Sequence, residues 1–360
     1  VTGSVFNRTN DYTNRGADIN PEDIESITVL KGPEAAALYG IDAASGAIII
    51  TTKKGQKGRG KVTYSNTFRF DELYRFPEIQ TKYAQGVNGV TDLNVRRQFG
   101  AAYPEGTQMY DNIGSFFQTG SKQNHSISIE GGNDMTTYRL ATAYLTQTGV
   151  VPNTKYDRMN ITLSGTTKFS DKFISEASMA YSNSNNIKAA RGTGGYLLGL
   201  LGWPANDDAS VYLTPAGTRR RLVSDASSDA DVDNPFYDVN KNQNSDKNNR
   251  VITNLAFKYN PFSWLNLTAR VGLDVSSTQG LLKYHPESQR AQSVGGSIDT
   301  YVDNTRNFNF QYFATGKKSF GKLHTSLMLG SAIYDNNYTV ASVRGEKFID
   351  YEFTSINNTD

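Results

Sequence analysis

The stretch NPEDIESITVLKGPEAAALYGIDAASGAIIITTKKG, from Asn20 to Gly55, differs in composition and period from everything that follows it. Asn20, followed by Pro21 and two acidic residues, predicts a short helical turn with a capped start. SITVL (26–30) and GAIIITTKK (46–54) predict two strands, with a short helix PEAAALY between them that Gly40 ends. The consecutive apolar residues of AIII predict a strand covered on both faces. The stretch therefore predicts a small packed strand–helix–strand unit.

After Gly55 the apolar residues recur at every second position, which is typical of strands with one apolar and one polar face. In the segment 158–169, Met159, Ile161 and Leu163 alternate with Asn160, Thr162 and Ser164. About nine such segments of ~10–12 residues follow one another, the length that a tilted strand needs to cross a bilayer. They lie near 61–70, 123–131, 136–146, 158–169, 173–183, 249–259, 265–275, 306–315 and 322–334.

The connections between these segments alternate in length. Short turns (GGND, SDK, NPFS and GK) alternate with long polar segments near 71–122, 185–247, 279–304 and 336–360, and a connection of moderate length spans 147–157. Aromatic residues gather beside the short turns: Phe169, Phe173, Tyr259, Phe262, Trp264 and Phe320. Short turns at one end, long loops at the other and an aromatic girdle are typical of transmembrane β-barrels.

The composition excludes several classes of protein. The chain has 360 residues, a net charge of +2 and no cysteine, so it offers no strongly basic surface for nucleic acid and neither disulfides nor thiolate metal sites. The apolar run YLLGLLGW (196–203) is too short to span a bilayer as a helix. The chain begins at Val1 without an initiator Met or signal peptide, and nine strands cannot close a barrel around a plug, so we expect a partial chain of a larger barrel.

Two local patterns resemble ligand sites but lack essential residues. GQKGRGK (55–61) is close to a phosphate-binding loop, but Val62 stands where Ser or Thr is needed and a strand follows. Asp229, Asp231 and Asp233 have the spacing of a calcium loop without its glycine and distal glutamate, so a solvated acidic loop is expected. We predict no metal, no cofactor and no catalytic residue.

Exposed aromatic residues on the long loops are the candidates for contact with a substrate or partner. They are Tyr74, Trp203, Tyr212, Phe236 and Tyr237. The apolar loop 192–204 could bind substrate or pack within a complex, and packing is favoured because contiguous apolar surface is seldom left exposed.

The opening stretch resembles the end of the plug domain in TonB-dependent outer-membrane transporters, and more narrowly the SusC/RagA-like group of the Bacteroidota. DIESITVLKG, ALYG, AASG and AIIITTKKG carry the resemblance, and 116–165 is similar to the first barrel strands of that group. The likeness covers about 18–190. It marks Gly32, Pro33, Leu38, Tyr39, Gly40 and Ile49 as plug-motif residues.

This resemblance implies a 22-stranded barrel occluded by a plug, a SusD-like surface lipoprotein as a lid, and energy from TonB through a segment absent from this chain. The expected fold class is therefore an all-β membrane barrel, present as a fragment, with the C-terminal part of an α+β plug domain. We expect residues 1–57 to belong to the plug and residues 58–360 to form the first nine barrel strands with their long loops.

The expected function is TonB-dependent import of a large nutrient, an oligosaccharide or peptide, across the bacterial outer membrane. The alternative is a SusC-like barrel that serves as a structural subunit of an outer-membrane assembly without transport.

Overall fold

The computed structural model describes residues 15–32, 43–190, 195–224 and 231–360. Two 3₁₀ turns, η1 (Arg15–Asp18) and η2 (Pro21–Asp23), lead into the antiparallel pair β1 (Ile24–Leu30) and β2 (Ala47–Thr52). Asn20 caps η2, its side chain accepting a hydrogen bond from the Glu22 backbone N–H. The capped turn and both strands are confirmed, while the short helix expected over 33–39 lies outside the described residues.

The expectation that the strand containing AIII, β2, is covered on both faces is not met by the described residues, and its partner β1 is open as well. Ile27, Val29 and Ile48 are 57%, 57% and 69% exposed, and Ile49 is only half-buried. The cause is geometric. A ribbon of two strands has two faces, and no further layer of described residues covers the face that points away from the wall. The residues AIII are apolar because the strand needs a packed layer on each face, and the described residues supply only part of that cover.

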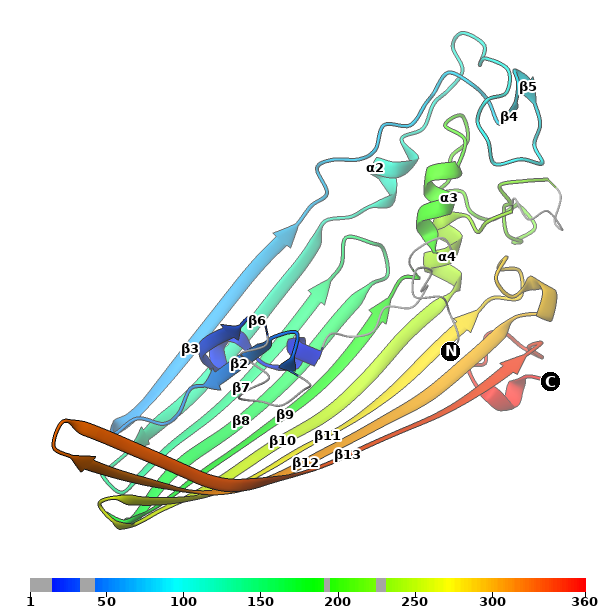
Figure 1. The fold of residues 1–360 in the computed structure, drawn as a ribbon. Coiled ribbons are helices and arrows are strands. Elements are labelled where there is room, and N and C mark those ends of the chain that lie inside the picture. Colours follow the sequence, from blue (N-terminus) through cyan, green and yellow to red (C-terminus); the bar gives the residue numbers. More distant parts are fainter. Residues whose placement is uncertain (1–14, 33–42, 191–194, 225–230) are drawn as a thin grey trace.

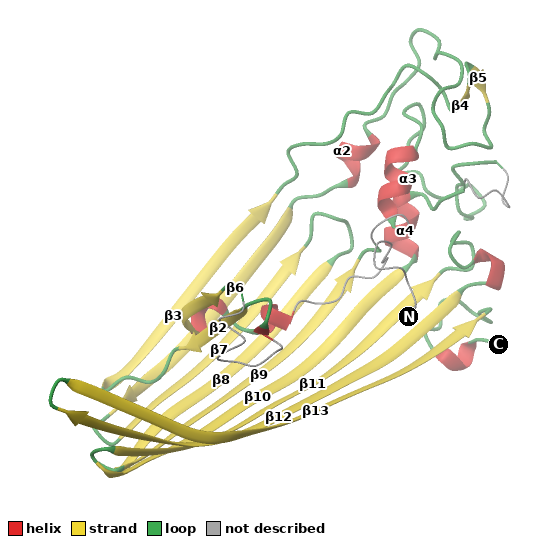
Figure 2. Cartoon of the chain, viewed as in Figure 1, coloured by secondary structure: helices red, strands yellow, loops and turns green. Residues whose placement is uncertain are grey.

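The rest of the chain forms a single antiparallel sheet of nine strands, in the order β13-β12-β11-β10-β9-β8-β7-β6-β3 (Figure 2). Each strand of this sheet pairs with the next strand of the sheet along the chain. The two small strands β4 (Gly86–Val87) and β5 (Val90–Thr91) lie outside it and pair with each other. The nine strands are β3 (Gly58–Asp71), β6 (Gly120–Gly132), β7 (Thr136–Thr148), β8 (Lys155–Ser170), β9 (Phe173–Lys188), β10 (Gln243–Phe262), β11 (Leu265–Tyr284), β12 (Ser297–Phe320) and β13 (Leu323–Glu346).

In this sheet the polar face is covered and the apolar face is exposed. On β8, the polar residues Arg158, Asn160, Thr162 and Ser164 are at most 9% exposed, whereas Leu163 is 49% exposed. We call the covered, polar face the inner face and the apolar, open face the outer face. A sheet of a water-soluble protein covers its apolar face instead. An exposed apolar face opposite a polar one is the arrangement of strands that have lipid on one side and a lumen on the other.

All nine predicted strands are present, and the excess over the predicted length is greatest in the last four. β10 and β11 have 20 residues each, and β12 and β13 have 24 each. The added residues lie at the long-loop end, where QNSDKNN (243–249) and SIDTYVDN (297–304) show no apolar–polar alternation. Beyond the bilayer both faces of a strand can be wet, so the period that identifies a membrane strand disappears although the ladder continues.

The predicted short turns are confirmed at one end of the sheet, and the aromatic residues beside them face outward. Phe169, Phe262, Trp264 and Phe320 are 54–60% exposed. Phe169 stacks on Phe173 with ring centroids 5.4 Å apart, and Phe262 stacks on Trp264 at 5.7 Å. Their place at the end of the apolar face matches an interfacial girdle.

At the opposite end, the long connections build a layer of loops and short helices, which we call the loop layer (Figure 1). It contains α2 (Asn112–Phe116), α3 (Tyr196–Gly202) and α4 (Pro235–Lys241), together with the 3₁₀ turns η5 (Gln292–Val294) and η6 (Ile356–Asn358). None of the helices in the described ranges has the length and apolar character to cross a membrane.

Candidate functional site

The N-terminal unit lies against the inner face of the sheet, and the contact between the two is polar (Figure 1). Hydrogen bonds tie residues that are more than 100 positions apart in sequence: the Asn160 amide donates to the Asp18 backbone oxygen at 2.7 Å, and Asn20 donates to the Ser126 hydroxyl at 3.4 Å. The inner face therefore uses its polar side chains as a docking surface for η1 and η2.

Asp23 is the most completely enclosed charge in this contact. The capped turn η2 positions it, and its carboxylate lies 2.8 Å from a guanidinium nitrogen of Arg139 on β7. Both side chains are only 4% exposed. The other carboxylate oxygen accepts a hydrogen bond from the Thr162 hydroxyl at 3.0 Å. Because a buried charge depends on its partner, this pair couples the N-terminal unit to the wall strongly.

A second ionic contact lies farther toward the loop layer. Arg250 on β10 binds Asp18 of η1 at 3.0 Å and Asp274 of β11 at 2.8 Å. Asp18 is 2% exposed at its side chain, so this contact is also shielded from water. Arg250 thus joins the N-terminal unit to two wall strands at once.

The third contact is more exposed and correspondingly weaker. Lys54, just after β2, and Lys258 on β10 both bind Glu176 on β9, at 3.0 and 2.7 Å. The Lys54 side chain is 54% exposed, and surface ion pairs contribute at most about 1 kcal/mol. This contact sets the direction of the chain after β2. It contributes little to holding the N-terminal unit on the wall.

The plug-motif residues expected from the resemblance fall into two groups. Gly32 ends β1 with a φ of +70°, which favours glycine, and Ile49 pairs with Thr28 in the β1–β2 ribbon. Pro33, Leu38, Tyr39 and Gly40 lie outside the described residues. Their role as a motif stays a prediction.

The loop-layer aromatics predicted as contact candidates differ sharply in exposure. Tyr74 is 93% exposed, and Tyr212 and Phe236 are partly buried, whereas Trp203 is 2% and Tyr237 0% exposed. Trp203 packs with Ala209, Leu222 and Val223, and Leu200 of α3 packs with Phe116, Ile113 and Val239. Trp203 and Tyr237 thus hold the loop layer together within this chain, and packing of the apolar loop against a partner stays a prediction.

The acidic run 229–233 is not a solvated loop where the structure describes it. Asp231 and Asp233 are buried, and Arg219, with a side chain only 1% exposed, pairs with both. Asp233 also accepts a hydrogen bond from Ser288. The sequence showed the acids but not the arginine 12 positions away that folds back onto them. Asp229 lies outside the described residues, which contain no cluster of three or more metal-ligating side chains.

Tyr237 and His285 connect α4 with the turn after β11. The Tyr237 hydroxyl lies 2.6 Å from Nδ1 of His285, and the Glu287 backbone N–H donates to the same nitrogen at 3.1 Å. Two donors on Nδ1 require that nitrogen to be unprotonated. Burial lowers the pKa of His285, which agrees with a neutral imidazole.

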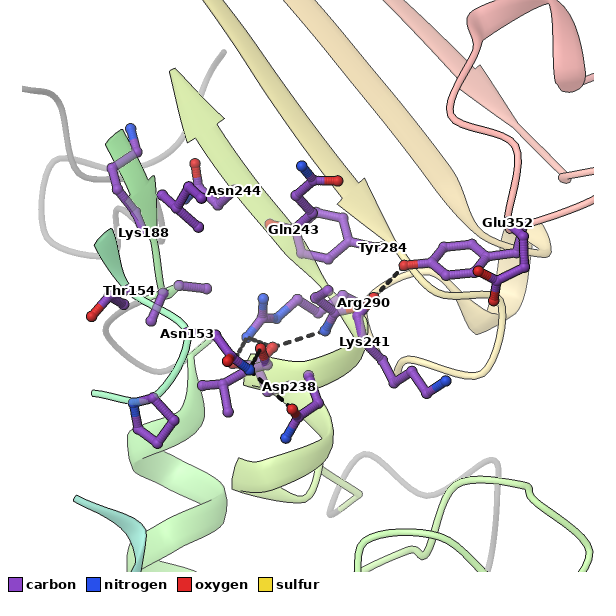
Figure 3. A pocket seen from close by; sticks show the side chains of 18 residues that line it. Asn153, Thr154, Lys188, Asp238, Lys241, Gln243, Asn244, Tyr284, Arg290 and Glu352 are labelled. Carbon is purple, nitrogen blue, oxygen red and sulfur yellow. Dashed lines mark hydrogen bonds and ion pairs between the residues drawn. The ribbon is translucent and has the colours of Figure 1, made fainter. Parts of the chain in front are cut away.

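A cavity of about 330 Å³ lies between α4 and the loop-layer ends of the wall strands (Figure 3). Asp238 of α4 and Arg290 form an ion pair in its wall at 3.1 Å. Burial raises the pKa of Asp238, although Arg290 acts in the opposite direction. This cavity could not be predicted from the sequence, because its walls come from segments that lie far apart in the chain.

Comparison with known proteins agrees with this architecture. Residues 3–47 match the family model of the TonB-dependent receptor plug domain. TonB-dependent receptor P3 of Formosa agariphila is 26% identical over 86% of this chain and 30% of its own length. TonB-dependent receptor SusC of Bacteroides thetaiotaomicron is 26% identical over 84% of this chain and 29% of its own length.

Solved structures agree on the fold. The RagAB peptide importer in its closed-closed state superposes with a TM-score of 0.75 at 18% identity, covering 96% of this chain and 42% of that chain. The RagAB peptide transporter structure gives the same TM-score, identity and coverage.

An N-terminal unit seated on the polar face of an outward-apolar sheet, together with the plug match, defines a TonB-dependent receptor. Within that class its similarity to SusC indicates a receptor fragment of the SusC/RagA-like type. It spans about 30% of the length of the two curated relatives described above.

Proposed function

We propose that this chain is part of a TonB-dependent importer that carries a large nutrient, an oligosaccharide or a peptide, across the bacterial outer membrane. The observation that carries the proposal is the plug-like unit docked by shielded ion pairs onto the polar inner face of a membrane-type sheet. A wide barrel needs such a plug to prevent leakage, and polar contacts can be exchanged for water when the plug moves.

The proposed domain division places residues 1–57 in the C-terminal part of the plug and residues 58–360 in the first nine barrel strands and their loops. The plug match at 3–47 and the start of β3 at Gly58 support this division. The proposed partners are outer-membrane lipid on the outer face, TonB as the energy source, and a SusD-like lipoprotein over the loop layer. Of the predicted aromatic candidates, Tyr74 is exposed and Tyr212 and Phe236 are partly exposed for a partner or substrate.

Tethering the plug to the wall should stop import. Asn20 and Ser126 touch across the contact, and these 360 residues hold no cysteine, so a cysteine at each position can be oxidised to a disulfide in the full-length protein after any cysteine outside this stretch is replaced. We expect the oxidised variant to lose uptake of labelled oligosaccharides or peptides, and a reductant to restore it. Each single cysteine variant is the control.

The tether also separates import from a purely structural role. A scaffold without transport would assemble with its partners equally well in the oxidised and reduced states, and deleting its gene would leave nutrient uptake unchanged. That pair of results would contradict the import proposal.

The orientation of the sheet in the membrane is tested with single cysteines. Ala216, on an exposed turn of the loop layer, is a suitable outer position. In intact cells, Ala216→Cys should react with a membrane-impermeant maleimide unless a partner covers it, and Ser319→Cys beside a short turn should not. Reaction of Ser319→Cys alone would reverse the proposed orientation.

A further inference from the structure

The cavity of about 330 Å³ beside α4 is formed on the inner face of the wall, at the loop-layer ends of the strands (Figure 3). Lys188 of β9 and Asn244 of β10 line one side, and Tyr351 and Glu352 of the last loop line another. Asn244 belongs to the inner-face series that includes Asp246 and Asn248, all at most 7% exposed. The volume falls at the lower end of the range for small-molecule pockets, which suits one sugar unit or one peptide terminus.

Two hydrogen-bond donors that line this cavity have no partner among the described residues. They are the side-chain amide Nδ2 of Asn244 and the guanidinium Nη1 of Arg290. Asn244 is 7% exposed, so its amide has little access to bulk water. By contrast, Asn248, four residues farther along β10 on the same face, donates to the Thr278 hydroxyl at 2.8 Å. Buried donors are nearly always satisfied, so this pair is open to an acceptor from outside the chain, either water or a polar group of a ligand.

The spare guanidinium N–H of Arg290 favours an anionic acceptor, whereas Lys188 is already paired with Asp246. Asp238 holds Arg290 at 3.1 Å, and the guanidinium carbon also lies 5.2 Å from the centre of the Tyr284 ring, so two neighbours hold the group in place. Figure 3 shows Lys188 and Asn244 on one side of the cavity and Glu352 on the opposite side. A guanidinium that is held in place and has a spare N–H is matched to a carboxylate, whose oxygens accept charge-assisted hydrogen bonds.

We propose that this cavity binds a carboxylate group of the imported nutrient, with Arg290 and Asn244 as the donors. The inference rests on the proposed import function and narrows its substrate class. Two sources share this chemistry, an acidic oligosaccharide built from uronic acids and a peptide with a free C-terminal carboxylate, and binding experiments can tell them apart.

The test measures binding to the purified full-length protein by titration calorimetry. Four probes suffice: trigalacturonic acid, its methyl ester, tetra-alanine and tetra-alanine amide. We expect one of the two acids to bind at least about tenfold more tightly than its masked form, as loss of a charge-assisted hydrogen bond implies. The acid that binds identifies the source of the carboxylate.

Asn244→Leu removes one donor at nearly constant volume and should weaken binding of that acid about fivefold or more. Asn248→Leu is the matched control, because it changes the same residue type on the same strand and face outside the cavity, and it should bind like the wild type. Equal binding of acid and masked forms by the wild type, or wild-type affinity in Asn244→Leu, would overturn the proposal. If the tethered plug still abolishes uptake in that case, the import function stands and only the carboxylate site falls.

Discussion

Asp23→Ala in the full-length protein is expected to release the plug from the wall while the barrel still inserts. The substitution leaves Arg139, with a side chain 4% exposed, only a distant contact with Glu130 at 3.9 Å, and it removes the acceptor of the Thr162 hydroxyl. Loss of one partner of a buried ion pair typically costs about 3–5 kcal/mol. Cells should become sensitive to a large antibiotic that the outer membrane normally excludes, and nutrient uptake should fall.

Two controls separate loss of this ion pair from general damage. Glu25→Ala removes an exposed carboxylate from the neighbouring strand β1 and should change neither permeability nor uptake. The double variant Asp23→Ala/Arg139→Leu removes the stranded charge as well, so it should leak less than Asp23→Ala alone. An Asp23→Ala protein as tight as Glu25→Ala would show that the pair does not hold the plug.

The sequence could predict the strands because lipid imposes a period on them. Alternation such as that of Met159, Ile161 and Leu163 against Asn160 and Thr162 appears only where one face meets hydrocarbon and the other a polar lumen. This rule located all nine strands of the sheet and their short turns, and it placed the aromatic residues at the correct end. It failed at the upper parts of β10 to β13, where both faces are polar and no period remains.

The contacts that seat the plug could not be predicted in the same way. Asp23 and Arg139 are separated by more than 100 residues, and each looks like an ordinary surface charge in its own segment. The same holds for Asp231 and Asp233, whose burial depends on Arg219 folding back from an otherwise irregular loop. Local patterns reveal which face of an element is polar, but only the assembled fold shows which polar residues become partners.

The structure also changes which substitutions we expect the inner-face positions to tolerate. From the alternation alone, Thr162→Arg should be accepted, because Thr162 faces away from lipid. In the structure Thr162 is 9% exposed and donates to Asp23 beneath the docked plug, so an arginine there would collide with the plug contact. An inner-face control for lipid exposure must therefore be taken from a part of the wall that the plug leaves open.

Leu163→Arg is expected to reduce insertion of the protein into the outer membrane severely. Leu163 is 49% exposed on the outer face, in the middle of the apolar band of β8, and its neighbour Leu140 on β7 is 44% exposed on the same face. Arginine on the lipid side of a barrel costs about 2–4 kcal/mol near the bilayer midplane. The measurement is the fraction of heat-modifiable, folded protein in the outer-membrane fraction.

Asn254→Arg provides the matched control at the same depth. Leu163 pairs with Met179, and Met179 pairs with Thr253, so Asn254 lies one residue from the same rung but points to the inner face. Its side chain is exposed and lines a cavity of about 210 Å³ at the edge of the plug contact, which leaves room for an arginine. Normal insertion of Asn254→Arg beside failure of Leu163→Arg would establish which face meets lipid. Equal insertion of both would contradict the assigned faces, because a charge costs several kcal/mol on only one side of a membrane-spanning strand.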